Sequence, residues 1–103
     1  MLKKKYRLPI QETIKKNGRT IRTPFFLIKV FPNNLPHSRF GVIVSKKVAK
    51  EATARNRLKR IIFSCLDPKA KAGADFLIIL SPKIKDLPKE EIIKNLKEVF
   101  NNN

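Results

Sequence analysis

The chain has 103 residues, with 24 lysines and arginines against eight aspartates and glutamates, for a formal net charge of +16. This length suits one small domain with a modest core, and such an excess of positive charge favours a polyanionic partner. Cys65 is the one cysteine, which excludes an internal disulfide and a zinc cluster built on paired cysteines. No stretch approaches the roughly eighteen apolar residues of a membrane span. We therefore expect a cytoplasmic protein with no membrane partner.

The first half of the chain predicts one helix and three strands. Pro9–Asn17 has a proline in its first turn and Gly18 after its last, which is typical of a short helix. Arg19–Arg22 predicts a short strand. Phe25–Phe31 is rich in aromatic and β-branched residues and predicts a longer strand, and Arg39–Val44 predicts another.

The second half predicts a helix, a buried strand and a closing helix. Apolar periodicity indicates a helix over Ala52–Leu66, stopped by the following Asp-Pro pair. Phe76–Leu80 is an apolar run suited to a buried strand, and Pro88–Phe100 has one apolar helical stripe. The order α-β-β-β-α-β-α predicts a single-domain α+β sandwich, with two or three helices on a mixed sheet.

Residues 46–60 hold the densest charge in the chain, with seven basic residues opposed by Glu51 alone. When residues of the helix are placed about 100° apart, one side becomes apolar and the other cationic. Asn56, Lys59 and Arg60 point away from the apolar stripe, and Arg55 and Arg57 lie on its two borders. The stripe consists of Ala54, Leu58, Ile61, Ile62, Cys65 and Leu66.

A solvated helix face with no partner would be the simpler explanation of this charge. It would need acidic residues three or four positions away to relieve the repulsion, and the run has almost none. An external polyanion relieves the repulsion instead. We therefore interpret residues 1–103 as a single RNA-binding domain, of which residues 1–8 form a loosely ordered basic tail.

No catalytic site is expected in the chain itself. His37 lies in a Pro-Ser loop without a cysteine or carboxylate at useful spacing, so it is expected to be exposed. The eight acidic residues are scattered, with no pair placed as general acid and base. We expect no catalytic residues, no metal ligands and no cofactor bound by the protein alone.

An ordered set of motifs resembles the bacterial ribonuclease P protein subunit. The resemblance covers roughly residues 6–100 and centres on a strand, a serine, two lysines and a basic helix. A Phe-rich strand, an Arg-x-Gly strand and an Asp-aromatic-aliphatic strand stand in the family's order around it. The matching segments are Phe26-Leu27-Ile28, Arg39-Phe40-Gly41, Val44-Ser45-Lys46-Lys47, Arg55-Asn56-Arg57-Leu58-Lys59-Arg60 and Asp75-Phe76-Leu77-Ile78-Ile79.

The resemblance implies a fold, a function and partners. The family fold is that of the second domain of ribosomal protein S5, with a left-handed β-α-β crossover that the general preference for right-handed crossovers would not predict. The implied function is to bind the ribonuclease P RNA and the 5′ leader of precursor tRNA and so promote 5′-end maturation of tRNA. The RNA subunit would carry the catalytic Mg²⁺, and the protein is expected to be monomeric without RNA.

The same resemblance implies the residues that bind the RNA subunit. Arginines of the motif would hold phosphates with two hydrogen bonds each, and Asn56 would either bond the RNA backbone or act as an internal strut. The implied set is Lys46, Lys47, Arg55, Asn56, Arg57, Lys59 and Arg60. We add Lys50 to the expected RNA-binding residues for its charge, since it has no strict match in the motif.

The leader site departs from the family. Gln11 and Lys15 stand where the family usually has aromatic residues, and Lys29 stands where some members have tyrosine. Strand alternation assigns Phe26, Ile28 and Val30 to the core and Lys29 to the leader cleft. We expect charge to replace much of the stacking at this site. The expected leader-binding residues are Gln11, Lys15, Lys29, Arg55 and Lys59.

Two alternatives stay open at this point. Phe63 replaces an arginine that the family tends to repeat, and it would either stack on a base or pack beneath the Lys69–Ala74 loop. A ribosomal or ribosome-assembly RNA-binding protein would share the charge and the fold. It would not require the ordered Lys-Lys and Arg-Asn-Arg set, and it would not stimulate cleavage.

Overall fold

The computed structural model describes residues 6–9, 18–67 and 73–102. The expected elements appear in the expected order, apart from the helix at Pro9–Asn17, nearly all of which lies outside the described residues. A short 3-10 helix that the sequence did not predict joins the last strand to the last helix. The elements are β1 (Arg19–Arg22), β2 (Phe26–Pro32), β3 (Arg39–Ile43), α2 (Ala52–Ser64), β4 (Ala74–Leu80), η2 (Pro82–Asp86) and α3 (Lys89–Asn102).

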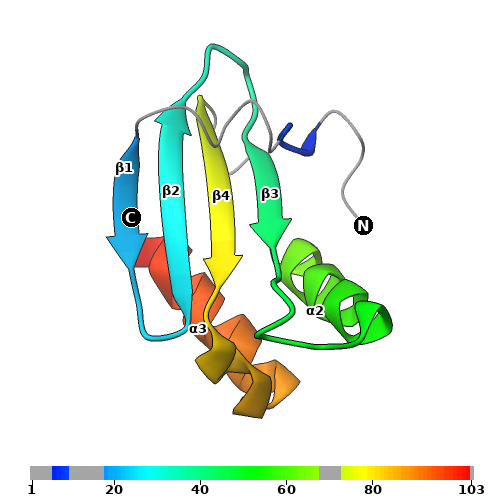
Figure 1. Cartoon of the computed structure of the whole chain (residues 1–103). Helices are drawn as coiled ribbons and strands as arrows, with labels where there is room; N and C mark the ends of the chain where they lie inside the picture. The colour runs from blue at the N-terminus through cyan, green and yellow to red at the C-terminus, as the bar shows by residue number, and fades with distance from the viewer. Residues whose placement is uncertain (1–5, 10–17, 68–72, 103) are drawn as a thin grey trace.

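The strands form one mixed sheet in the order β1-β2-β4-β3 (Figure 1). β2 pairs antiparallel with both β1 and β4, whereas β3 pairs parallel with β4. The parallel register sets Arg39 opposite Asp75 at one end of this pair. β4 is therefore an inner strand, and its run of Phe76–Leu80 is the buried strand that the apolar pattern predicted.

The connection from β3 through α2 to β4 is left-handed. Ile62 of α2 packs in the same apolar cluster as Ile92 and Leu96 of α3, so both helices cover one face of the sheet. Figure 1 views the sheet from the other face, with α3 behind the strands and β3 to the right of β4. A parallel crossover that moves leftward behind downward strands has left-handed sense. Roughly 98% of such crossovers are right-handed. The left-handed crossover that the family resemblance implied is nevertheless confirmed.

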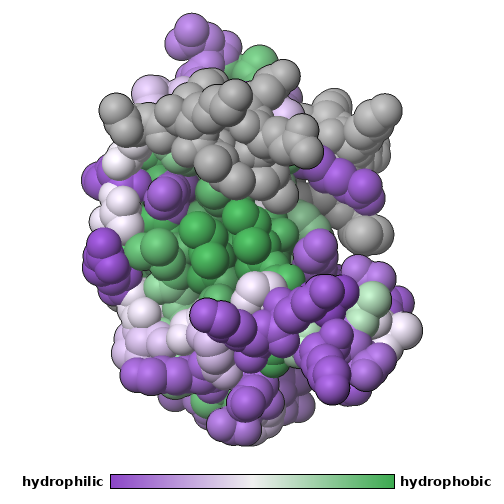
Figure 2. All heavy atoms as spheres, in the orientation of Figure 1, coloured by the Kyte–Doolittle hydropathy of each residue, from purple (hydrophilic) through white to green (hydrophobic). Residues whose placement is uncertain are grey.

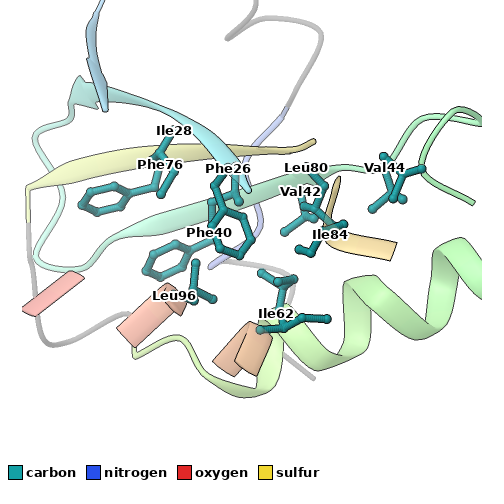
Figure 3. Packing of buried hydrophobic residues seen from close by; sticks show 13 residues of the cluster. Phe26, Ile28, Phe40, Val42, Val44, Ile62, Phe76, Leu80, Ile84 and Leu96 are labelled. Carbon is teal, nitrogen blue, oxygen red and sulfur yellow. The ribbon is translucent and has the colours of Figure 1, made fainter. Parts of the chain in front are cut away.

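The main core lies between the sheet and the two helices (Figure 3). Alternate residues of β2 and β4 point into this core, and three of them, Phe26, Ile28 and Ile78, are at most 1% exposed. The rings of Phe40 and Phe76 stack with centroids 5.4 Å apart, and Phe100 of α3 packs edge-on against both. The assignment of Phe26, Ile28 and Val30 to the core side is confirmed.

The opposite face of the sheet carries a second, smaller apolar cluster. Its buried members are Leu8, Phe31 and Leu77, and Ile43 and Ile79 pack against them while partly exposed. Figure 2 views this face and shows an apolar area across the middle of the sheet with hydrophilic groups at its sides and below it. No helix among the described residues covers this side, and we call it the open face of the sheet.

Gly18 lies immediately before β1, where backbone passes very close to β2. A Cβ atom at this position would meet the carbonyl oxygen of Val30 and the ring of Phe31 at less than contact distance. The close approach explains why glycine is needed here even though its φ angle is not positive. Among the described residues, no helix is long and apolar enough to cross a membrane.

Candidate nucleic-acid interface

A tight loop joins β3 to α2 and presents the paired lysines. The backbone N–H groups of Val48 and Ala49 donate to the carbonyl oxygen of Ser45, at 3.1 and 3.3 Å. Val48 is 2% exposed and belongs to the main core, so it anchors the loop at its centre. Lys46 and Lys47 are exposed on the outer side of this turn. The hydrogen bonds of the turn fix the backbone of both lysines, while their side chains extend into solvent.

Arg55 ties the start of α2 to this loop. Its Nη1 donates to the carbonyl oxygens of Ala49, at 3.1 Å, and of Lys50, at 2.8 Å. The sequence predicted a phosphate clamp at Arg55 and either an RNA contact or a strut at Asn56. In the structure Arg55 is the strut, whereas Asn56 is exposed. The RNA-binding role of both residues stays a prediction, with Nη1 of Arg55 already engaged by the loop.

The cations of α2 lie along its two flanks. Arg57 and Arg60 are exposed and lie along the flank that faces α3, where both line a hollow with Lys89. Lys59 is half-buried on the other flank, one turn after Arg55. The sequence placed Lys59 and Arg60 together on the side opposite the apolar stripe. Successive residues lie about 100° apart around a helix, so Lys59 falls on one flank and Arg60 on the other, beside α3.

The open face of the sheet holds the one expected leader residue that the structure describes in a strand. Lys29 is half-buried on β2, paired in register with Thr20 of β1 and Leu77 of β4. Where β2 begins and β4 ends, a hollow of about 310 Å³ is lined by residues that include Arg22, Leu27 and Ile79 but not Lys29. Gln11 and Lys15 lie outside the described residues. Among the described residues, this face of the sheet therefore combines the charge of Lys29 with apolar side chains.

Sequence reasoning missed a polar cluster at the end of β3 and β4. Asp75 is 1% exposed and accepts from both Nε and Nη2 of Arg39, at 2.9 and 2.7 Å. Asn33, in the loop after β2, donates to the same carboxylate at 2.5 Å. The three residues fix the β2–β3 loop to the inner strand. The sequence did contain the two motifs, an Arg-x-Gly strand and a strand that begins with Asp. Their parallel register, which sets the two side chains opposite each other, came from the structure.

Phe63 and Cys65 both have structural surroundings. Phe63 is half-buried and packs against the main core, which supports the packing alternative over base stacking. The loop beneath which it was expected to lie falls mostly outside the described residues. Cys65 is half-buried against the same cluster, and its thiol donates to the carbonyl oxygen of Ile61 at 3.2 Å.

His37 is half-buried rather than exposed. Its ring packs edge-on against Tyr6, with centroids 4.8 Å apart, and its Nδ1 lies 3.1 Å from the carbonyl oxygen of Ser38. Across residues 6–9, 18–67 and 73–102, no three histidine, cysteine or carboxylate side chains lie together as metal ligands. The described surface can bind anions, because exposed lysine and arginine side chains lie beside apolar side chains.

Comparison with known proteins decides the family. The Ribonuclease P family profile matches residues 2–103, almost the whole chain. The chain belongs to the Ribonuclease P protein family. Its relatives include the ribonuclease P protein component of Synechocystis, which is 37% identical over 86% of this chain and 75% of its own length. That of Lactobacillus gasseri is 34% identical over 96% of this chain and 87% of its own.

Solved structures of the family share the fold. The Staphylococcus aureus RNase P protein superimposes with a TM-score of 0.79 at 27% identity, covering 93% of both chains. The RNase P protein from Thermotoga maritima gives a TM-score of 0.80, covering 90% of this chain and 95% of its own. The latter is 24% identical and supports the fold alone. Membership of the family assigns the chain a role in tRNA processing, as the protein component of an endoribonuclease.

Proposed function

We propose that this chain is the protein subunit that binds ribonuclease P RNA and the 5′ leader of precursor tRNA, and so promotes 5′-end maturation of tRNA. The observation that carries the proposal is the arrangement of two surfaces on opposite sides of one sheet. α2 packs on one face of the sheet and exposes cations along its flank beside α3, while no described helix covers the other face around Lys29. Two RNA segments can therefore be held at the same time.

The RNA subunit would bind the loop and the exposed positions of α2. Lys46, Lys47 and Lys50 are exposed on the loop, and Asn56 and Arg60 are exposed on the helix. Arginine and lysine at fixed positions on a folded surface suit the phosphates of a folded RNA, with guanidinium groups able to make two parallel hydrogen bonds. Because the contacts are ionic, binding should release counterions and weaken steeply with salt.

The leader would cross the open face of the sheet. The half-buried Lys29 supplies charge there, and Leu27 and Ile79 supply apolar ground. Stacking of one base on an aromatic side chain is worth about 1–3 kcal/mol. Leader affinity in this chain should accordingly depend on charge, and it should fall steeply between low and moderate salt.

The catalytic step belongs to the RNA subunit in this proposal. Mg²⁺ would be held by the RNA, and the protein would contribute binding and orientation of the substrate. The protein is proposed to be monomeric before it meets the RNA. Asp75, the buried carboxylate of the described core, is engaged by Arg39 and Asn33 and so is not offered to a metal ion.

Binding of a bacterial ribonuclease P RNA to charge-matched variants tests the first surface. Arg60→Gln removes one charge from α2, and Lys97→Gln removes one from an exposed position of α3. Arg60→Gln should weaken binding and reduce the slope of log affinity against log salt by about one. Lys97→Gln should change neither. Equal effects of the two variants would show that net charge alone governs binding.

A series of precursor tRNAs with leaders of increasing length tests the second surface. In the holoenzyme, affinity should rise as the leader lengthens, and Lys29→Gln should remove part of that gain. The affinity for mature tRNA should be the same in both proteins. A leader-length dependence unaffected by Lys29→Gln and by KCl would contradict the proposed leader path.

A further inference from the structure

A groove runs between α2 and the segment formed by η2 and α3. Its volume is about 770 Å³, within the range of sites that hold small organic ligands. Leu58 and Ile61 of α2 form one apolar wall and Leu87 forms part of the other, each of them only partly buried. Ile84 and Ile92 are at most 2% exposed and close the groove at its base. The apolar stripe of α2 is thus left partly uncovered along its first two turns.

The rim of the groove is cationic on both sides. Arg57 and Arg60 line it from α2, and Lys85 and Lys89 line it from η2 and α3. All four are exposed. Glu51, at one end, is the acidic residue among those that line it, so the groove carries a net charge of about +3. A second hollow of about 250 Å³ shares Arg57, Arg60 and Lys89 and extends the same cationic rim.

The apolar walls and cationic rim together favour a ligand that has both a flat, weakly polar ring and a negative charge. An uncharged apolar segment would leave four cations facing one another across the groove, which like-charge repulsion disfavours. A base-paired RNA strand presents phosphates but keeps its bases stacked inside the helix. An unpaired nucleotide presents both parts together, because its base can be turned out of the stack and its phosphate stays outside.

We propose that the α2–η2–α3 groove binds an unpaired nucleotide of single-stranded RNA. The base lies on Leu58, Ile61 and Leu87, and its phosphate lies between Arg57, Arg60 and Lys89. The site lies on the helix-covered side of the sheet, away from the open face around Lys29. The inference rests on the proposed function for the source of the nucleotide, and it adds a contact to that partnership.

The direct test is a titration of the ¹⁵N-labelled chain with a single-stranded uridine hexanucleotide, followed by two-dimensional NMR. Amide signals of Ala54, Leu58, Leu87 and Lys89 report on the groove and give a dissociation constant for it alone. Binding elsewhere on the chain does not enter that constant. We expect these signals to shift together with one affinity. Shifts that leave the groove amides unchanged up to millimolar RNA would overturn the proposal.

Two α3 lysines provide a charge-matched comparison. Lys89→Gln removes a rim cation, and Lys94→Gln removes an exposed cation of the same helix that does not line the groove. Lys89→Gln should weaken the groove affinity about threefold, as expected for one partly screened ionic contact. Lys94→Gln should leave it unchanged. Equal effects of the two variants would overturn the site.

Two further probes separate the nucleotide from other polyanions. A hexamer of abasic ribose phosphates keeps the charge and lacks the bases, and it should bind the groove more weakly than the uridine hexamer. Equal binding would reduce the groove to a plain charge contact and overturn the proposal. A hexaglutamate peptide should not displace the RNA at equal charge concentration, and displacement would indicate an acidic protein segment as the occupant.

The two proposals fail in different ways. If the chain does not bind ribonuclease P RNA, the proposed function is wrong whatever the groove does. If it binds that RNA normally while the groove amides ignore the uridine hexamer, the groove proposal alone is wrong.

Discussion

Arg55 donates a hydrogen bond to the carbonyl oxygen of Lys50 at 2.8 Å, and the same nitrogen also reaches the carbonyl oxygen of Ala49. A residue of the basic motif therefore holds the loop that carries the other basic residues. α2 begins without a side-chain cap at Glu51, so this guanidinium is the side-chain link between the first turn of the helix and the preceding loop. Charge and loop geometry are coupled through one side chain.

Replacing Arg55 should affect both stability and RNA affinity. Arg55→Ala removes two hydrogen bonds to partly exposed carbonyl groups, and we expect it to lower the free energy of unfolding by about 1 kcal/mol. RNA affinity should fall further than the loss of one charge explains, because Lys46, Lys47 and Lys50 lose their fixed backbone. Urea unfolding followed by circular dichroism, together with RNA binding, measures the two effects. Arg60→Ala serves as the control, with lower affinity and unchanged stability.

Neighbouring isoleucines of α2 should differ in their contribution to stability. Ile62 is 0% exposed in the main core, whereas Ile61 is half-buried and lines the groove. Ile62→Ala should cost about 3 kcal/mol, and Ile61→Ala about 1 kcal/mol, since a cavity forms only where neighbours enclose the site. Chemical denaturation of both variants measures the difference. Equal losses would mean that the groove is closed in solution.

The buried carboxylate of Asp75 should be indispensable to the end of the sheet. Asp75→Asn keeps the size of the side chain but removes the negative charge to which Arg39 and Asn33 donate hydrogen bonds. Loss of one partner of a buried pair costs about 3–5 kcal/mol. Arg39 is one quarter exposed and so partly solvated, and we expect a loss of about 2 kcal/mol. The thermal midpoint of unfolding measures it, and Asp86→Asn, at an exposed position, is the control.

Gly18 should tolerate no side chain. In Gly18→Ala the new methyl group meets the backbone oxygen of Val30, which cannot turn aside as a flexible side chain would. Such overpacking costs about 1–3 kcal/mol. Gly73 has a φ of 87°, and a Cβ atom there would lie 3.8 Å from the carbonyl oxygen of Asn33, an ordinary contact distance, so Gly73→Ala provides a contrast with backbone strain but no clash. Denaturation midpoints of both variants, combined with a crystal structure of Gly18→Ala, would show whether β1 has moved away from β2.

Much of the fold could be predicted because the apolar patterns are local. The alternation in β2 and the stripe on α2 each assign residues to one side of an element. Boundaries were harder, as β4 begins at Ala74, two residues before the predicted strand. Asp75 resembled a boundary of the strand because it is charged. Its ion pair with Arg39, from a distant part of the chain, lets it lie buried inside the strand. The 3-10 helix η2 was missed because five residues containing a proline give no helical period.

The candidate site was predicted in composition more than in geometry. Its cations lie on a helix and the loop before it, as the sequence pattern predicted, and their role in RNA binding stays a prediction. The helical stripe could not separate the buried Ile62 from the groove-lining Leu58 and Ile61, because that depends on where η2 and α3 lie. Arg55 holds the loop because the loop folds back on the helix. The apolar periodicity of α2 says nothing about the path of that loop.

The most direct test of the central claim is reconstitution of cleavage. The purified chain is mixed with a bacterial ribonuclease P RNA and a precursor tRNA at low Mg²⁺, where the RNA alone is slow, and release of the 5′ leader is followed. The account predicts that the chain restores cleavage, and that Arg60→Gln requires more protein to do so while Lys97→Gln does not. Tight binding of the RNA without any stimulation of leader release would contradict it and favour an RNA-binding protein with no part in cleavage.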